Sequence, residues 1–191
     1  MSTFVRLTKA GYYADFVFYP GLLLVLAGVA LDRDTLARFC LWAVSFGAGL
    51  AAWTLLEYWL HRLLFHRVFP FRKLHEMHHA APTAKIGTPT WVTGGLVCGC
   101  VLLPLGWTLG FNLASGFTAG LAAGYLWYVS MHHAAHHWRA RPGGYLHTAK
   151  LRHAWHHHAH YPCCFGVTTA FWDRVFRTAR WNPGFQSGSE G

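Results

Sequence analysis

The sequence predicts an all-α integral membrane protein with four transmembrane helices and a histidine-rich helical cap on the cytosolic side. Three observations support this prediction. The 191 residues are 53% hydrophobic and only 12% charged, whereas about a quarter of the residues in a soluble domain are charged. Long apolar runs alternate with short polar segments, and fifteen histidines gather in a few clusters beside those runs. We expect residues 1–191 to form a single domain.

Four apolar segments have the length of about 20 residues that a helix needs to cross a bilayer. We expect transmembrane helices at about 12–31, 39–60, 91–109 and 113–131. In the fourth, Gly116, Gly120 and Gly124 recur every four residues, a pattern that lets neighbouring helices approach closely. The segments 61–88 and 132–180 are too polar to cross, and we expect them to form cytosolic metal-binding regions.

The basic residues indicate the orientation in the membrane. With four spans, all but two of the sixteen Lys and Arg residues lie on the side of the N-terminus and the C-terminal region, the two being Arg33 and Arg38. Because basic loops remain in the cytoplasm, we expect both termini to be cytoplasmic, in a bacterial inner membrane or the endoplasmic reticulum. The net charge of +9 then indicates an anionic membrane surface, and no nucleic acid, as the partner.

The histidines recur at spacings that suit metal binding. The motif H-x-x-H-H occurs twice, and positions i, i+3 and i+4 lie on one helix face, so we expect three imidazoles to point at one place. Neutral imidazole is the commonest metal ligand in proteins, and the clusters all fall on the predicted cytosolic side. The candidate ligands are His61, His66, His75, His78, His79, one pair from the doubled motif at 132–137, His153, His156 and His157.

Two features leave details of the ligand set open. The doubled motif offers His132 with His136, or His133 with His137. His61 and His66 are five residues apart, which is about 140° around an ideal α-helix. We therefore expect the helix to end or bend between them.

The ligand set restricts the chemistry. It is large enough for two metal ions with about five imidazoles each, whereas a tetrahedral zinc site needs four ligands. The carboxylate-bridged di-iron bundle takes a Glu-x-x-His motif from each of two helices. The chain has this spacing once, from Glu76 to His79, so that bundle is excluded. Imidazole suits Zn, Cu, Fe and Ni alike. Oxidation at the membrane requires a redox metal such as iron, although zinc can take its place in a preparation.

Other polar residues near the motifs are candidates for supporting or replacing a ligand. Glu57 lies one helical turn before His61 and is a candidate to orient it. Asp173, like Glu76, is expected to pair with an arginine at the surface, with a contact to a ligand as the alternative. His133, His137 and His160 complete the set of alternative ligands.

At these residues the chain resembles the fatty acid hydroxylase (sterol desaturase-like) superfamily of membrane di-iron enzymes. Within it, the resemblance is to fatty acid 2-hydroxylases, without their cytochrome b5 domain, and it covers roughly residues 50–178. The motifs that carry it are W-T-L-L-E-Y-W-L-H at 53–61, H-E-M-H-H at 75–79, Y-V-S-M-H at 128–132 and H-A-W-H-H-H-A-H at 153–160. Counting back without gaps from His153, the resemblance selects His132 and His136 as the third pair.

The resemblance implies a cytosolic centre of two iron ions, which a lipid chain reaches from the membrane. It implies that O2 and two electrons place one oxygen atom in a C–H bond beside a carbonyl. The expected position is C2 of a fatty acyl chain, free or in ceramide or another lipid. The electrons are expected from a separate cytochrome b5-like or ferredoxin-like protein, and no catalytic residue beyond the metal ligands is expected.

Three alternatives remain at this point. The first is another lipid oxidation of the same superfamily, such as carotenoid or sterol hydroxylation or desaturation. The second is a metal transporter, but transporters place ionisable ligands near the middle of the membrane, whereas these histidines cluster at one edge. The third is a haem-binding electron carrier that uses paired histidines.

Overall fold

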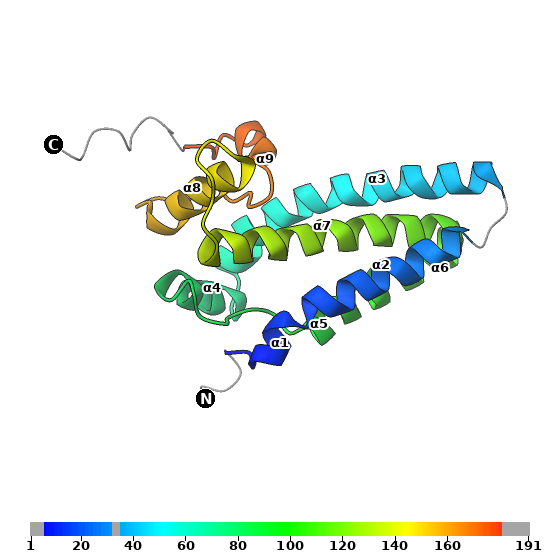
Figure 1. The fold of residues 1–191 in the computed structure, drawn as a ribbon, viewed down its shortest axis with the longest axis horizontal. Coiled ribbons are helices and arrows are strands. Elements are labelled where there is room, and N and C mark those ends of the chain that lie inside the picture. Colours follow the sequence, from blue (N-terminus) through cyan, green and yellow to red (C-terminus); the bar gives the residue numbers. More distant parts are fainter. Residues whose placement is uncertain (1–5, 32–34, 181–191) are drawn as a thin grey trace.

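The computed structural model describes residues 6–31 and 35–180, and every secondary-structure element among them is a helix (Figure 1). Two of the elements, η1 and η2, are π-helical. In chain order the elements are α1 (Lys9–Tyr13), α2 (Asp15–Leu31), α3 (Leu36–Trp59), η1 (Leu60–Phe65), α4 (Phe71–Ala80), α5 (Thr90–Leu96), η2 (Val97–Leu102), α6 (Leu103–Leu109), α7 (Phe111–His137), α8 (Tyr145–His158) and α9 (Phe171–Val175). The all-α prediction is confirmed for the described part of the chain.

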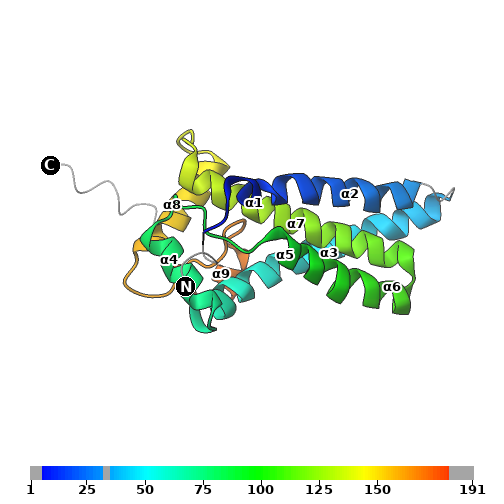
Figure 2. The ribbon, with the colours of Figure 1, turned by 90° about the horizontal axis from the view of Figure 1, so that it is seen from below.

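The long helices run side by side, and the short helices α4, α8 and α9 gather at one end of them (Figures 1 and 2). Helix α7 lies at the centre of this bundle and contacts α2, α3, α6 and α8. The helical cap that we expected therefore exists at one end of the bundle. It is built from the histidine-rich segments of the sequence.

Three helical segments among the described residues are long and apolar enough to cross a membrane, namely Lys9–Gly28, Leu36–Phe65 and Thr90–Leu109. They correspond to the first three predicted spans. Helix α7, which contains the predicted fourth span, has 27 residues and is therefore about 40 Å long. It is not among the three, because its glycine, serine and tyrosine residues lower its hydropathy. Because α7 is surrounded by other helices, it needs fewer apolar side chains facing lipid than an outer helix does. The fourth span remains a prediction.

The stripe of glycines brings α7 into backbone contact with α3. A Cβ atom at Gly120 would lie 2.0 Å from the carbonyl oxygen of Phe46, and one at Gly116 would lie 2.6 Å from that of Trp42. On the opposite helix, a Cβ atom at Gly49 would lie 2.0 Å from the carbonyl oxygen of Phe117. The close approach predicted from the spacing of these glycines is confirmed.

Helix α7 continues beyond the predicted end of the fourth span, from residue 131 to His137. Its last turns therefore carry histidines into the cap, where they face residues of α4 and α8. One continuous helix thus links the centre of the bundle to the histidine clusters.

Candidate metal centre

The structure gathers all ten histidines of the ligand set, with His132 and His136 as the third pair, into two groups of five. The first group comprises His61, His66, His75, His79 and His156, and the second comprises His78, His132, His136, His153 and His157. Within each group, one ring nitrogen of every histidine lies within 4.8 Å of those of the other four.

The spacing between these nitrogens fits coordination of a shared ion. Nitrogens held about 2.1 Å from one ion lie about 3 Å apart when their bonds are at right angles. The neighbouring Nε2 atoms are 2.8 Å apart in the pair His153–His136 and 3.3 Å apart in the pair His66–His156. Lone pairs that converge at such distances repel one another unless a proton or a cation lies between them. The donor set therefore fits a metal ion in each group.

Each H-x-x-H-H motif is divided between the two groups. In α4, His75 and His79 belong to the first group and His78 to the second, while in α8 His153 and His157 belong to the second group and His156 to the first. On an α-helix, residues i and i+4 are about 40° apart, but residue i+3 is about 100° away from i+4. The expectation that all three imidazoles point at one place is therefore wrong, and α4 and α8 each serve both groups.

A π-helical turn brings His61 and His66 together. The α3 helix continues through η1, whose hydrogen bonds follow the wider i→i+5 pattern. In this winding a residue lies close to the one five positions later, and the two imidazole rings are 5.3 Å apart between centroids. Our expectation that the helix ends or bends between them is wrong, because the chain widens the helix instead.

The alternative histidines lie outside both groups. His133 faces another side of α7, where its Nδ1 atom is 3.0 Å from the hydroxyl oxygen of Tyr12. The exposed ring of His137 stacks on that of His133 with the centroids 4.4 Å apart. His160 is exposed beyond the end of α8.

Burial keeps the grouped histidines neutral. Loss of solvent around the rings, followed by the proximity of other histidines, lowers the pKa of His66 to about 4, of His78 to about 3 and of His157 to about 2. The same burial lowers the pKa of His156 to about 3. At neutral pH these rings carry no charge, so their nitrogen lone pairs are available to a metal ion.

Backbone carbonyls fix the orientation of two of the rings. The Nδ1 atom of His61 lies 2.6 Å from the carbonyl oxygen of Phe165, and that of His156 lies 2.7 Å from the carbonyl oxygen of Cys163. Since a carbonyl can only accept, Nδ1 carries the proton in both rings. The unprotonated Nε2 atoms then point at the first group, as a metal ligand requires.

Asp173 holds the loop that supplies the Phe165 carbonyl. It is fully buried, and its carboxylate accepts hydrogen bonds from the backbone N–H groups of Phe165 at 2.9 Å and Gly166 at 2.8 Å. The favoured prediction of a surface ion pair is therefore wrong for Asp173. For Glu76 it is confirmed, because its exposed carboxylate lies 3.4 Å from the Nε atom of Arg72.

Glu57 stabilises the same loop from α3 and touches no histidine of either group by hydrogen bond. Its carboxylate accepts from the backbone N–H groups of Val167 at 2.7 Å and Thr168 at 2.9 Å. Arg152 of α8 holds the loop from the other side, donating to the carbonyl oxygens of Gly166 and Val167. Glu57 thus contacts the candidate ligands only through the loop. The contribution of Arg152 was missed, because no motif distinguishes it from the many surface arginines.

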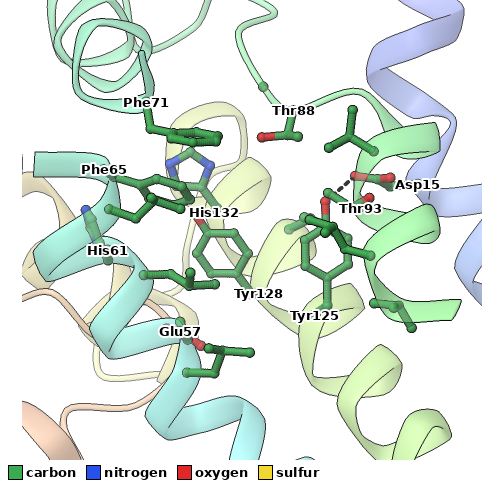
Figure 3. Close-up of a pocket in the computed structure, with 18 of the residues that line it drawn as sticks. Asp15, Glu57, His61, Phe65, Phe71, Thr88, Thr93, Tyr125, Tyr128 and His132 are labelled. Atoms are coloured by element: carbon green, nitrogen blue, oxygen red, sulfur yellow. Dashed lines mark hydrogen bonds between the residues drawn. The ribbon is translucent and has the colours of Figure 1, made fainter. Parts of the chain in front are cut away.

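An apolar cavity of about 420 Å³ leads from the long apolar helices to the histidines. Its wall includes His61 and His75 of the first group and His78 and His132 of the second. Phe65, Phe71 and Tyr128 lie beside the histidines, while Asp15, Thr93 and Tyr125 lie across the cavity from them (Figure 3). Residues deeper in the bundle, such as Val97, Val101 and Leu121, complete the apolar wall. The arrangement can bring a hydrocarbon chain to both groups.

Comparison with known proteins gives a consistent result. A family model described as fatty acid hydroxylase matches residues 46–178. The chain is 32% identical over 191 aligned residues to the ceramide very long chain fatty acid hydroxylase of Saccharomyces cerevisiae. This alignment covers 90% of this chain and 46% of the yeast protein. It is 33% identical over 144 aligned residues to the human fatty acid 2-hydroxylase, and this alignment covers 70% of this chain and 38% of the human protein. The chain thus spans half or less of the length of these two relatives.

A plant protein and a solved structure extend this similarity. The dihydroceramide fatty acyl 2-hydroxylase of Arabidopsis thaliana is 33% identical over 157 residues, which cover 74% of this chain and 62% of the plant protein. The structure of full-length scs7p, in which only the hydroxylase domain is visible, superimposes with a TM-score of 0.73 at 31% sequence identity. That alignment covers 90% of this chain and 67% of the other.

Proposed function

The chain belongs to the fatty acid hydroxylase family, and from this premise we propose that it is an O2-dependent membrane oxidoreductase that hydroxylates a lipid. The position we propose is C2 of a fatty acyl chain. The observation that carries the proposal is the opening of one apolar cavity onto histidines of both five-membered groups. The names of the relatives describe hydroxylation of fatty acids and of fatty acyl groups in ceramides.

We propose that each group of five histidines holds one iron ion, with zinc as a substitute in some preparations. When bound, the iron pair supplies the activation of O2, for which two electrons are required. The chain's own contribution is a set of ten neutral imidazoles, whose burial lowers their affinity for protons. The carbonyl oxygens of Phe165 and Cys163 hold two of the rings with Nε2 toward the ions.

The cavity wall positions the acyl chain. A hydrocarbon chain offers no polar group, so the carbon that is oxidised is decided by how far the chain enters. Phe65, Phe71 and Tyr128 line the cavity beside the histidines, and their apolar rings would exclude water from the reacting carbon (Figure 3). The apolar wall in the bundle accommodates the rest of the chain.

The membrane arrangement that we propose has four spans, with α7 as the fourth, and both termini in the cytoplasm. The three apolar segments and the location of the cap at one end of the bundle support it. A cytochrome b5-like or ferredoxin-like protein is the proposed electron donor. Two observations, the family and the position of the histidines at one end of the helices rather than at their middle, favour oxidation over metal transport.

Lipid mass spectrometry of cells that express the chain tests this function. Cells with the wild-type chain are expected to gain lipids heavier by one oxygen atom, with fragmentation placing that atom at C2 of the acyl chain. Cells with His156→Ala are expected to show no gain, whereas His133→Ala, outside both groups, retains it. The proposed C2 hydroxylation would be wrong if the added oxygen were found at another carbon, or if the cells gained a new double bond or modified sterols or carotenoids. Each of these products would indicate another lipid oxidation.

A further inference from the structure

An acidic side chain lies in the wall of the cavity, away from the histidines. Asp15 is the first residue of α2, within the apolar segment Lys9–Gly28, and only 8% of it is exposed. The hydroxyl of Tyr125 donates a hydrogen bond to its Oδ2 atom at 2.7 Å. Its other oxygen, Oδ1, has no hydrogen-bond partner among the described residues. Figure 3 shows the pair on the opposite side of the cavity from His132 and His61.

This carboxylate is costly for the fold to keep. An ionisable residue in a membrane span is expensive and usually has a function, and a buried acceptor without a donor costs about 1–3 kcal/mol. The ion pair that the described part of the chain contains joins Arg72 to Glu76, so no described cation neutralises Asp15. Asp15 also belongs to neither group of candidate metal ligands. An acidic side chain suits the first turn of α2, but neither this position nor the metal centre supplies a partner for Oδ1.

We propose that Asp15, oriented by Tyr125, is a subsite that accepts a hydrogen bond from a neutral donor group of the lipid. An ionised carboxylate has acceptors only, so its free Oδ1 atom requires an N–H or O–H group. The subsite repels the carboxylate of an ionised free fatty acid. It favours an acyl chain joined through an amide to a hydroxylated amine. This inference rests on the proposed function, since it concerns the substrate of the same cavity.

The position of the subsite agrees with a donor beyond the amide bond. Tyr125 and His132 are seven residues apart on α7, which corresponds to a rise of about 10 Å along the helix. In an N-acylated amino alcohol, a hydroxyl five bonds from C2 lies up to about 6 Å from that carbon, given bonds of about 1.5 Å. The rise along α7 is therefore longer than the distance from the hydroxyl to C2, and the difference leaves space between C2 and the histidine nitrogens. A neutral hydroxyl also avoids the desolvation cost that an ammonium group would incur in this apolar wall.

Equilibrium binding of two matched ligands to the purified protein tests the subsite. Both ligands carry the same 2,2-difluorinated acyl chain, which cannot be hydroxylated at C2. One is an N-acyl amino alcohol and the other is the free acid. Titration calorimetry in detergent at neutral pH is expected to show that the wild-type protein binds the amino alcohol more tightly. Asp15→Asn retains an oxygen for Tyr125 but removes the charge, and is expected to reduce this preference about tenfold or more.

Two further variants make the test specific. Glu76→Gln removes a carboxylate from the exposed surface of α4 and is expected to keep the wild-type preference. Tyr125→Phe removes only the hydroxyl that orients Asp15 and is expected to reduce the preference by a smaller factor, so it serves if Asp15→Asn does not fold. The proposal is overturned if the folded variants keep the wild-type preference, or if an analogue with an ammonium in place of the hydroxyl binds more tightly.

Because the assay measures binding without turnover, its outcome is separate from that of the proposed function. A wild-type chain that hydroxylates C2, together with Asp15→Asn that binds both ligands in the wild-type ratio, refutes the subsite alone. A preference that depends on Asp15, in a chain that oxidises another position, supports the subsite and refutes the C2 assignment.

Discussion

The Nδ1–H group of His61 donates a hydrogen bond of 2.6 Å to the carbonyl oxygen of Phe165. The two residues are 104 positions apart in the sequence, so this contact connects a candidate ligand on η1 to the loop that follows α8. The backbone N–H group of the same Phe165 donates to Asp173. One peptide unit therefore lies between a buried carboxylate and a candidate metal ligand.

This chain of contacts from Asp173 through Phe165 to His61 predicts that Asp173→Asn lowers metal affinity, although Asp173 is not itself a candidate ligand. In Asp173 a different carboxylate oxygen accepts from each of Phe165 and Gly166, and an asparagine replaces one of these oxygens with an NH2 group, which cannot accept. Loss of such an outer contact typically lowers metal affinity by about 10–100-fold. We expect weaker binding at the first group in a chelator competition, and a lower unfolding temperature. Glu76→Gln, which changes an exposed carboxylate of α4, serves as the control, and equal metal affinity in the two variants would contradict this chain of contacts.

The division of the histidines into two groups predicts independent losses of metal. His156→Ala removes a candidate ligand from the first group and His153→Ala removes one from the second. Each variant is expected to fall from two bound ions per chain to one, as measured by inductively coupled plasma mass spectrometry. His133→Ala, whose ring contacts Tyr12 instead, is expected to keep both ions. Loss of both ions in either single variant would indicate one joint site rather than two.

The contact between α3 and α7 predicts opposite effects at two neighbouring glycines. A Cβ atom at Gly49 would lie 2.0 Å from the carbonyl oxygen of Phe117, whereas one at Gly47 would have nothing within 4 Å. Gly49→Ala therefore separates the helices and is expected to destabilise the protein by about 1–3 kcal/mol or more. Gly47→Ala gains helix propensity worth about 0.5–1 kcal/mol. Thermal unfolding in detergent measures both, and equal stability of the two variants would refute the close contact.

Burial of the histidines predicts that the metal-free protein loses stability as the pH falls. In the folded state the pKa values of His78 and His156 are lowered to about 3, whereas an exposed histidine has a pKa of about 6.5. Between these values the unfolded chain binds more protons than the folded chain, so stability decreases as the pH falls through this window. We expect the unfolding temperature of the metal-free protein to decrease from pH 7.5 to pH 5. A constant or rising unfolding temperature over this range would contradict the account.

Much of this architecture is visible in the sequence because hydropathy and residue type carry it. The three apolar segments and eight of the ten histidines follow from patterns that need no tertiary information. The resemblance supplied the remaining pair, His132 and His136. Two features do not. The π-helical winding at His61 depends on the packing of the cap, and the division of each H-x-x-H-H motif depends on which helices lie on either side of α4 and α8.

Asp173 illustrates a further limit of sequence reasoning. In a chain with sixteen Lys and Arg residues, a basic residue at the surface is the expected partner of an isolated acidic residue. Its partners are instead backbone N–H groups of a nearby loop, which every residue but proline offers and which no motif marks. Asp15 was likewise overlooked, because its importance depends on a cavity formed by helices that are distant in the sequence.

The most direct test of the account is a single reaction of the purified, iron-loaded protein with ¹⁸O-labelled O2, a chemical reductant and an acyl lipid. The account predicts two iron ions per chain and one labelled oxygen atom at C2 of the acyl chain, with no label when His156→Ala replaces the wild type. A lipid recovered without label from the fully iron-loaded wild-type protein, or one labelled away from C2, would contradict it.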